Sequence, residues 1–148
     1  MSSISASHLV AEVELTRFDR FEQYWVPRGY ASLAPIKTMS RIDVPRSGQI
    51  VEPGDTVIAG VAWAQTRGIS KVEVRVDDGP FVEAELADAL GEEAWRQWRL
   101  PWAATPGAHR LVVRATDGGG RLQTEERAEP LPDGASGWQS LLVTVRAA

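Results

Sequence analysis

Short runs in which apolar and polar residues alternate, separated by turn signals, constrain this chain more than any other feature. In Lys71–Val76 three valines alternate with charged residues, and a period of two recurs in Leu111–Thr116 and Leu141–Val145. Such a period places apolar side chains on one face of a strand and polar side chains on the other. A succession of short strands of this kind predicts an all-β sandwich.

The block AWRQWRLPWAATPGAHRLVVRATDGGG, Ala94–Gly120, joins three tryptophans, a turn and an alternating strand, and we expect it to form the heart of the sandwich. Val57–Ala64 is apolar on both faces, which is typical of a strand that is central or lies at an interface. Asp78-Gly79 is a turn signal that predicts a hairpin. Only Glu85–Trp95 has much helical preference, and it is too short to form a layer. We expect strands near Ser40–Val44, Asp55–Ala64, Ile69–Asp77, Pro80–Leu86, Ala94–Pro101, His109–Thr116 and Trp138–Arg146.

The N-terminal part differs in character from the rest of the chain. Met1–His8 is small and polar, and we interpret it as a disordered or artificially added tail. Residues 9–39 offer one short alternating strand, Ala11–Arg17, and then an aromatic cluster broken by proline and glycine. This segment predicts an extended connector without a core of its own. We expect a single sandwich domain over residues 40–148.

Composition excludes several classes of function. The 148 residues include no cysteine, which excludes disulfides, thiolate metal sites and a cysteine nucleophile within this chain. The net charge of -4 arises from 16 basic and 20 acidic residues mixed along the sequence, so neither a nucleic-acid surface nor an anionic-membrane patch is indicated. No apolar run is long enough to span a bilayer, and no signal peptide is evident.

The polar residues form no convincing catalytic or metal-binding pattern. His8 and His109 are the only histidines and lack metal-ligand spacing, so we expect no zinc or catalytic-histidine site. Gly118-Gly119-Gly120 is followed by neither a helix nor a lysine, which favours a flexible turn over a phosphate loop. The loop Gly118–Gly137 exceeds the usual length and is therefore a candidate functional or interface element.

The tryptophans admit two interpretations. They form either an aromatic platform for stacking a sugar or base, or part of the core and an interface. Trp95 and Trp98 are three residues apart and should face opposite sides of a regular strand, which favours packing. The core or interface candidates are Val57, Val61, Trp63, Trp95, Trp98 and Trp102.

Arg28 is the side chain most suited to binding a ligand. It lies in WVPRGY, where Pro27 and Gly29 restrict the backbone and Trp25 and Tyr30 surround a guanidinium able to hold an oxyanion bidentately. A surface arginine stacked on tryptophan is the alternative, and residue chemistry alone favours it.

The chain resembles the C-terminal domain of the sulfite oxidase family of molybdopterin oxidoreductases. The resemblance runs through GVAWAQTRGISKVEVRVDDGPFVEAEL, AWRQWRLPW, PGAHRLVVRATDGGGRLQTEE and PDGASGW. Upstream, ELTRFDRFEQYWVPRGY resembles the end of the family's molybdenum-binding domain and its bridge, and APIKTMSRIDVPRSG resembles the first strand. The resemblance implies an immunoglobulin-like β-sandwich of about seven strands, preceded by the extended connector.

The resemblance also implies a function. The sandwich would be a non-catalytic dimerisation domain that forms a homodimer and braces the catalytic domain of the same parent. The molybdenum-molybdopterin cofactor would belong to that parent, with no cofactor or catalytic residue in this chain. Arg28 and Trp25 match the region that reaches the family's substrate pocket. Bacterial relatives suggest an extracytoplasmic parent, although these residues carry no targeting signal. The alternative is an immunoglobulin-like module that recognises a carbohydrate or protein through exposed tryptophans.

Overall fold

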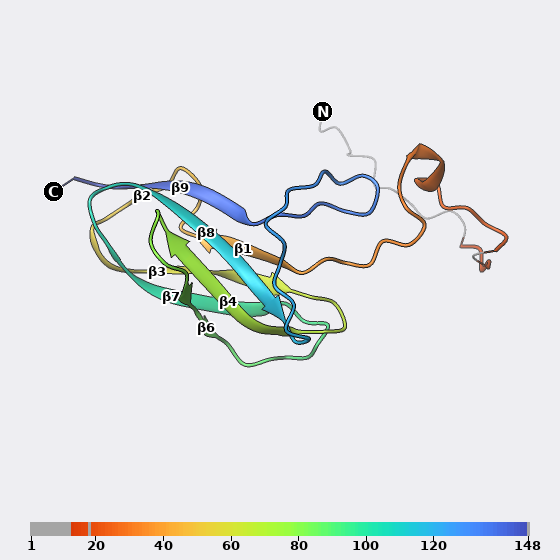
Figure 1. Ribbon diagram of the computed structural model, residues 1–148, viewed down its shortest axis with the longest axis horizontal. Coiled ribbons are helices and arrows are strands. Elements are labelled where there is room, and N and C mark those ends of the chain that lie inside the picture. The colour runs from red at the N-terminus through yellow and green to blue at the C-terminus, as the bar shows by residue number, and fades with distance from the viewer. Residues whose placement is uncertain (1–12, 18, 148) are drawn as a thin grey trace, which may run out of the picture.

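Two β-sheets pack face to face in the computed structural model, which describes residues 13–17 and 19–147. The first, which we call the β3 sheet, has the order β1-β3-β7-β6, and the second, the β8 sheet, has the order β2-β9-β8-β4-β5 (Figure 1). Neighbouring strands are antiparallel except for β2 and β9, which are parallel. The immunoglobulin-like sandwich is therefore confirmed. Its strands are β1 Met39–Val44, β2 Ile50–Val51, β3 Gly54–Trp63, β4 Ile69–Val76, β5 Val82–Glu83, β6 Glu85–Leu86, β7 Arg96–Ala104, β8 Gly107–Asp117 and β9 Gln139–Val145.

One predicted strand, Pro80–Leu86, is wrong as a single element. The structure divides it into β5, which pairs with β4, and β6, which pairs with β7 in the other sheet. The buried Ala84 lies between them and donates its backbone N–H to the Val72 carbonyl at 2.8 Å. The hairpin that Asp78-Gly79 predicts is confirmed by the antiparallel pairing of β4 with β5, and its turn has a positive backbone angle at Asp77, φ 52°. After β6, the weak helical preference of Glu85–Trp95 yields no helix.

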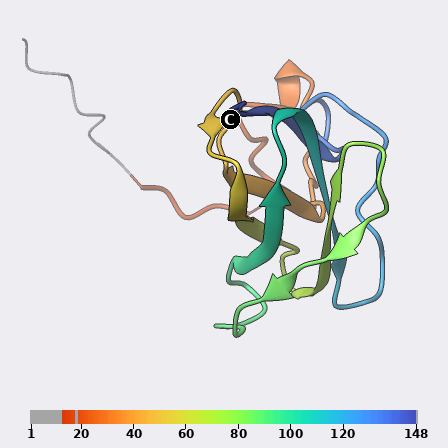
Figure 2. The ribbon, with the colours of Figure 1, turned by 90° about the vertical axis from the view of Figure 1, so that its left-hand side faces the viewer.

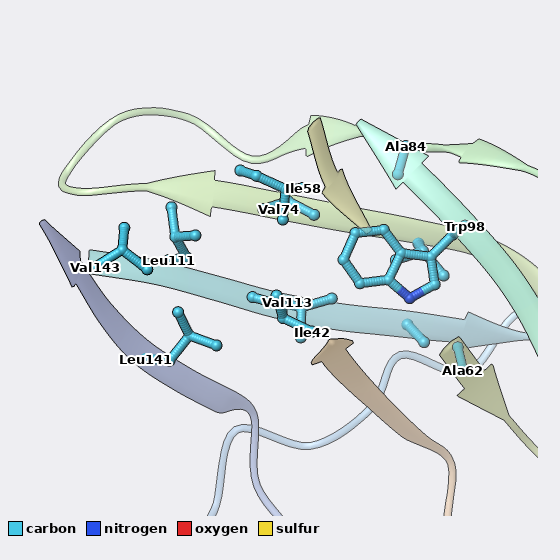
Figure 3. Packing of buried hydrophobic residues seen from close by; sticks show 12 residues of the cluster. Ile42, Ile58, Ala62, Val74, Ala84, Trp98, Leu111, Val113, Leu141 and Val143 are labelled. Atoms are coloured by element: carbon cyan, nitrogen blue, oxygen red, sulfur yellow. The ribbon is translucent and has the colours of Figure 1, made fainter. Parts of the chain in front are cut away.

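The core consists of small and branched apolar side chains between the two sheets, together with one large ring, that of Trp98 (Figure 3). Ile58 of β3 is fully buried, as are Val72 of β4 and Leu111 of β8. Gly60 lies between β1 and β7 where there is no room for a side chain, because a Cβ there would collide with the Arg41 carbonyl and the Trp98 ring. The buried cluster contains Ile42, Ile58, Ala62, Val72, Val74, Ala84, Trp98, Leu111, Val113, Ala115, Leu141 and Val143.

The connector precedes the sandwich and forms a single short 3-10 helix, η1, over Val26–Arg28. Of the predicted strand Ala11–Arg17, residues 11 and 12 lie outside the described residues, and residues 13–17 form no strand. Leu15 is 100% exposed there, so this extended segment lacks the neighbour that strand pairing requires. Figure 2 shows this first described part of the chain running away from both sheets. His8 and the rest of the tail, 1–8, also lie outside the described residues.

Replacement of Ile58 by alanine tests which face of β3 is the core. We expect Ile58→Ala to lower the free energy of unfolding by about 2–5 kcal/mol, because it leaves a cavity at a fully buried position. Val57→Ala should cost less than about 1.5 kcal/mol, because Val57 is half-buried on the opposite face. Val72→Ala is the size-matched buried control. Urea unfolding at low protein concentration measures all three, and a larger loss for Val57 than for Val72 would contradict this assignment.

Candidate functional site

The outer face of the β3 sheet carries a continuous set of apolar side chains. Since Ile58 and Ala62 point into the core, the intervening odd-numbered residues of β3 point outward. These are Val57, Ala59 and Val61, all half-buried, with Trp63 at the end of the row. The register pairs Val57 with Pro101, and the exposed residues Pro101 and Ala103 extend the row onto β7. The β8 sheet packs on the opposite side of the β3 sheet, so among the described strands none covers this outer face.

The predicted tryptophan set is divided between the core and this outer face. Trp98 is 3% exposed within the core, and Trp102 packs against the core from its margin. Trp95 is 44% exposed and stacks on Trp63 with ring centroids 5.3 Å apart. The Trp63 indole N–H also donates to the Glu93 carbonyl at 3.2 Å. Trp95 and Trp98 thus lie on opposite sides, as their spacing predicts, and no three of the tryptophans of this block share one platform.

Two ion pairs flank the apolar row on the outer face. On β1, Arg41 Nε lies 2.7 Å from Asp43 Oδ1, and at the opposite edge Arg99 Nε of β7 lies 2.8 Å from Glu85 Oε2. Between these edges lies a groove of about 580 Å³, lined by residues that include Val44, Ala59, Val61 and Gln97. A bulge in β1 between Ile42 and Val44 contributes to its irregular wall. The face is therefore apolar in its middle and charged, with both signs, at its margins.

The outer face of the β8 sheet is different in chemistry. Arg114 Nε lies 3.0 Å from Glu73 Oε2, and its guanidinium lies over the rings of Phe81 and Trp138 at 3.8 and 5.4 Å. Lys71 shares the same carboxylate at 3.3 Å. Burial alone would raise the pKa of Glu73, but hydrogen bonds from Arg114 and Lys71 bring it below its usual value. This face is an aromatic and basic layer.

Val112 occupies the same β8 face and is 5% exposed, although it lies outside the core cluster. Val112 interrupts the alternation of apolar and polar residues in Leu111–Thr116, and its burial indicates a second, smaller packing surface. Its strand neighbours across the sheet are Arg75 and Ser140. The aliphatic stem of Arg75 can cover part of such a valine while its charged head remains in water.

Arg28 is exposed in η1 but is not free to bind. Its Nη1 donates to the Tyr24 carbonyl at 2.6 Å, and its guanidinium lies 3.5 Å from the centre of the Tyr24 ring. Trp25 is 57% exposed and packs edge-on against Tyr24 and Tyr30. The structure thus brings Arg28 and Trp25 into one aromatic cluster, with tyrosine rather than tryptophan as the stacking partner. Within the described chain, the guanidinium would have to leave Tyr24 to hold an oxyanion.

Two buried polar side chains, which sequence reasoning did not single out, hold the long loop and the connector to the sandwich. Gln123 Oε1 accepts from Ser40 Oγ at 2.7 Å and from the Ala115 N–H at 3.1 Å, while its amide donates to the Gly137 carbonyl. Asp117 is 1% exposed and accepts from Arg67 Nε at 2.8 Å. A buried amide and a buried carboxylate each need such partners, but no local pattern in the sequence indicates them.

Asp117 also explains the triglycine turn. Its Oδ1 accepts from the backbone N–H groups of Gly119 and Arg121, each at 3.0 Å. Burial alone would raise its pKa, but these bonds and the Arg67 guanidinium bring the pKa below its usual value. A Cβ at Gly118 would collide with the Arg67 carbonyl. The glycines therefore shape a turn around a carboxylate of the chain itself.

The connector is pinned to the same loop by three contacts. The Ala31 N–H donates to the Pro132 carbonyl at 2.8 Å, and Lys37 Nζ donates to Asp133 Oδ1 at 3.0 Å and to the Gly134 carbonyl at 2.7 Å. We call this set the connector clasp. The open cleft beside it, of about 810 Å³, is lined by both segments. The predicted interface role of Gly118–Gly137 therefore includes a contact within the chain.

His109 lies near the start of β8 between two oxygens that accept hydrogen bonds. Its Nδ1 is 2.7 Å from Asp77 Oδ2 and its Nε2 is 2.7 Å from the Thr105 carbonyl. The carboxylate hydrogen bond raises the pKa of His109, since only the protonated ring donates from both nitrogens. The Arg110 N–H and then His109 lower the pKa of Asp77. The ring also lies edge-on to Trp102, with centroids 5.5 Å apart.

This arrangement predicts a pH dependence of stability. The contribution from His109 is complete below its ordinary pKa of 6.5 and is lost as pH rises through the raised pKa of the folded state. That from Asp77 is complete above 3.8 and is lost as pH falls through its lowered folded-state pKa. We expect the thermal midpoint of His109→Gln to fall least, relative to the unaltered protein, at alkaline pH. A difference between the two proteins that is constant from pH 5 to pH 9 would contradict this linkage.

Among residues 13–17 and 19–147, no three histidine or carboxylate side chains are grouped so as to hold a metal ion. No helix in this described part of the chain is long and apolar enough to cross a membrane.

This chain is similar in sequence to known proteins. No protein-family model matches the sequence. Mitochondrial sulfite oxidase of Homo sapiens is 33% identical over 104 residues, and that of Mus musculus is 34% identical over 106 residues. In both cases the match covers 64% of this chain and 19% of the other protein. The chain therefore spans about a fifth of the length of the sulfite oxidases it matches.

Two solved structures share the fold. The sulfane dehydrogenase SoxCD from Paracoccus pantotrophus superposes with a TM-score of 0.58 at 22% identity, over 76% of this chain and 33% of that chain. An endo-β-1,4-mannanase from Thermotoga petrophila superposes with a TM-score of 0.51 at 13% identity, over 76% and 20% respectively. At these identities the likeness concerns the fold alone. The sequence match confirms the resemblance of this chain to the C-terminal domain of the sulfite oxidase family.

Proposed function

We propose that this chain is a non-catalytic structural domain of a sulfite-oxidase-like, molybdopterin-dependent oxidoreductase. Its two tasks are to self-associate as a homodimer and to brace the catalytic domain of the same parent. The observation that carries the proposal is a packed sandwich from which an apolar, largely exposed connector leads away. We assign molybdopterin-dependent oxidation to the parent because this chain matches sulfite oxidase in sequence.

The connector supports the bracing role. Its large apolar side chains are poorly covered: Leu15 is 100% exposed, Leu33 84%, Tyr24 62% and Trp25 57%. Several large apolar side chains exposed along one segment suggest that another body covers it, and two of them, Tyr24 and Trp25, pack edge-on against each other. The connector clasp fixes the base of this segment to the sandwich. We infer that the catalytic domain packs on the connector and takes its orientation from the clasp.

The molybdenum cofactor belongs to the parent in this proposal. The chain has no cysteine to ligate molybdenum, and its described residues contain no metal-holding group. No step of the chemistry is therefore assigned to this chain. Arg28 and Trp25 are the residues that we place near the substrate, and there Arg28 would exchange its bond to the Tyr24 carbonyl for one to an anion.

A binding module is the second candidate, favoured by the half-exposed Trp95. One face of its ring is already stacked on Trp63, which leaves at most the other face for a sugar. Titration with soluble oligosaccharides separates the two functions. The structural role predicts unchanged tryptophan fluorescence, whereas a saturable change that Trp95→Ala abolishes would favour the binding module.

Expression of this chain and of the full parent tests the main proposal. We expect molybdenum and acceptor reduction by an oxyanion such as sulfite in the parent, and neither in the isolated chain, because the ligands are absent from it. Metal analysis and steady-state assays measure both. A parent that lacks a molybdenum domain, or turnover by the isolated chain, would contradict the proposal.

Within the parent, Arg28→Gln should raise KM for the anionic substrate roughly 10- to 100-fold, the effect of losing one hydrogen bond to a charged group. Arg20→Gln, at an exposed position of the same connector, is the matched control. Equal KM values for the two variants would exclude Arg28 from the substrate pocket.

A further inference from the structure

We propose that Arg67 is a positioning residue for the parent enzyme: it fixes the connector to the sandwich and thereby sets where Arg28 and Trp25 lie relative to the catalytic domain. Arg67 lies in the turn between β3 and β4, far along the chain from the connector residues that it contacts. This inference rests on the bracing role in the proposed function and names a residue through which the sandwich performs it.

The guanidinium of Arg67 bonds to the sandwich and to the connector at the same time. Its Nε donates to Asp117 Oδ2 at 2.8 Å, and that carboxylate is buried in the sandwich. Its Nη2 donates to the Ile36 carbonyl and to Thr38 Oγ1 of the connector, each at 3.4 Å. The Thr38 hydroxyl in turn donates to the same Asp117 oxygen at 3.5 Å. The planar fork of an arginine suits such a double contact, whereas a lysine presents a single point charge.

The turn that carries Arg67 is itself held in place. The Arg67 N–H donates to the Ala64 carbonyl at 3.1 Å, and the Gly118 N–H donates to the Gly68 carbonyl at 3.0 Å. A Cβ at Gly118 would collide with the Arg67 carbonyl, so the two turns lie in close contact. Because the backbone of Arg67 and its Nε are already fixed, little further ordering is needed for its bonds to the connector.

Arg67 and the connector clasp hold the same short stretch of the connector from two different elements. Ile36 and Thr38 bond to Arg67 of the β3–β4 turn, while Lys37 between them donates to Asp133 of the loop before β9. This stretch directly precedes β1, and Figure 1 shows the connector running from there away from both sheets. The direction in which the connector leaves the sandwich is therefore set at these three residues.

Three variants separate positioning from stability. Arg67→Gln removes the charge and the fork, whereas Arg67→Lys keeps a cation for Asp117 and loses the fork. Arg121→Gln is the matched control, because Arg121 pairs with the same Asp117 oxygen at 3.4 Å from a side chain that is 71% exposed. Within the described part of the chain, no hydrogen bond joins the Arg121 side chain to the connector.

Trypsin cleavage of this chain measures the anchoring directly. Mass spectrometry compares cleavage after Lys37, within the anchored stretch, with cleavage after Arg20, which is exposed. Relative to Arg20, we expect both Arg67 variants to be cleaved after Lys37 about tenfold faster than the unaltered chain, the effect of losing hydrogen bonds from a charged group. Arg121→Gln should match the unaltered chain.

Urea unfolding of the same proteins excludes a general loss of stability. We expect Arg67→Lys to retain most of the free energy of unfolding, because its ammonium still neutralises Asp117. Equal cleavage after Lys37 in all four proteins would overturn the inference. Faster cleavage that also occurs after Arg75, within β4, and follows the loss of stability would overturn it as well.

Steady-state kinetics of the parent test the consequence for the active site. We expect both Arg67 variants to raise KM for the anionic substrate roughly tenfold with little change in kcat, because the groups that hold the substrate are displaced. Unchanged KM values would overturn the positioning role. A parent without molybdenum would contradict the proposed function alone, because cleavage after Lys37 is measured in this chain and does not depend on the cofactor.

Discussion

The alternation of β3 between the two sides of its sheet is the constraint on which the rest of this structure depends. Ile58 and Ala62 enter the core, and their neighbours Val57, Ala59 and Val61 are thereby directed outward. A shift of one residue would exchange the two sets, because side chains along a strand have a period of two. Gly60 fixes the register, since the close approach of the Arg41 carbonyl leaves no room for a side chain. The register of β3 therefore determines both which side chains fill the core and which lie on the outer face of the β3 sheet.

Buried polar side chains hold the irregular segments of the chain against the sandwich. Gln123 joins β1, β8 and the loop that precedes β9. Asp117 joins the turn between β3 and β4 to the triglycine turn through Arg67 and Gly119. Each has several partners, so the cost of burying it is offset. Lys37 then fastens the connector to the loop thus held. The connector inherits a defined position from polar contacts rather than from a core of its own.

The sequence predicted the features that repeat along the strands and missed those that depend on a distant partner. Alternation in Lys71–Val76 and Leu111–Thr116 located two core strands, and the spacing of Trp95 and Trp98 placed them on opposite sides. The division of Pro80–Leu86 between two sheets depends on Val72 and the edge of β7, neither of which is a local signal. The burial of Gln123 likewise depends on residues far away in the chain.

The doubly apolar stretch of β3 shows where sequence and structure each contribute. Apolar residues on both faces indicated a strand that is central or lies at an interface, and the sequence left that choice open. The structure shows that β3 is central within its sheet, between β1 and β7, and that Ile58 and Ala62 on one face are buried in the core, whereas the residues of the other face are half-buried. For a strand with one buried face, the apolar character of the other face is not required by folding. The sequence alone could not decide which of the two apolar faces fills the core, because that choice depends on where the β8 sheet lies.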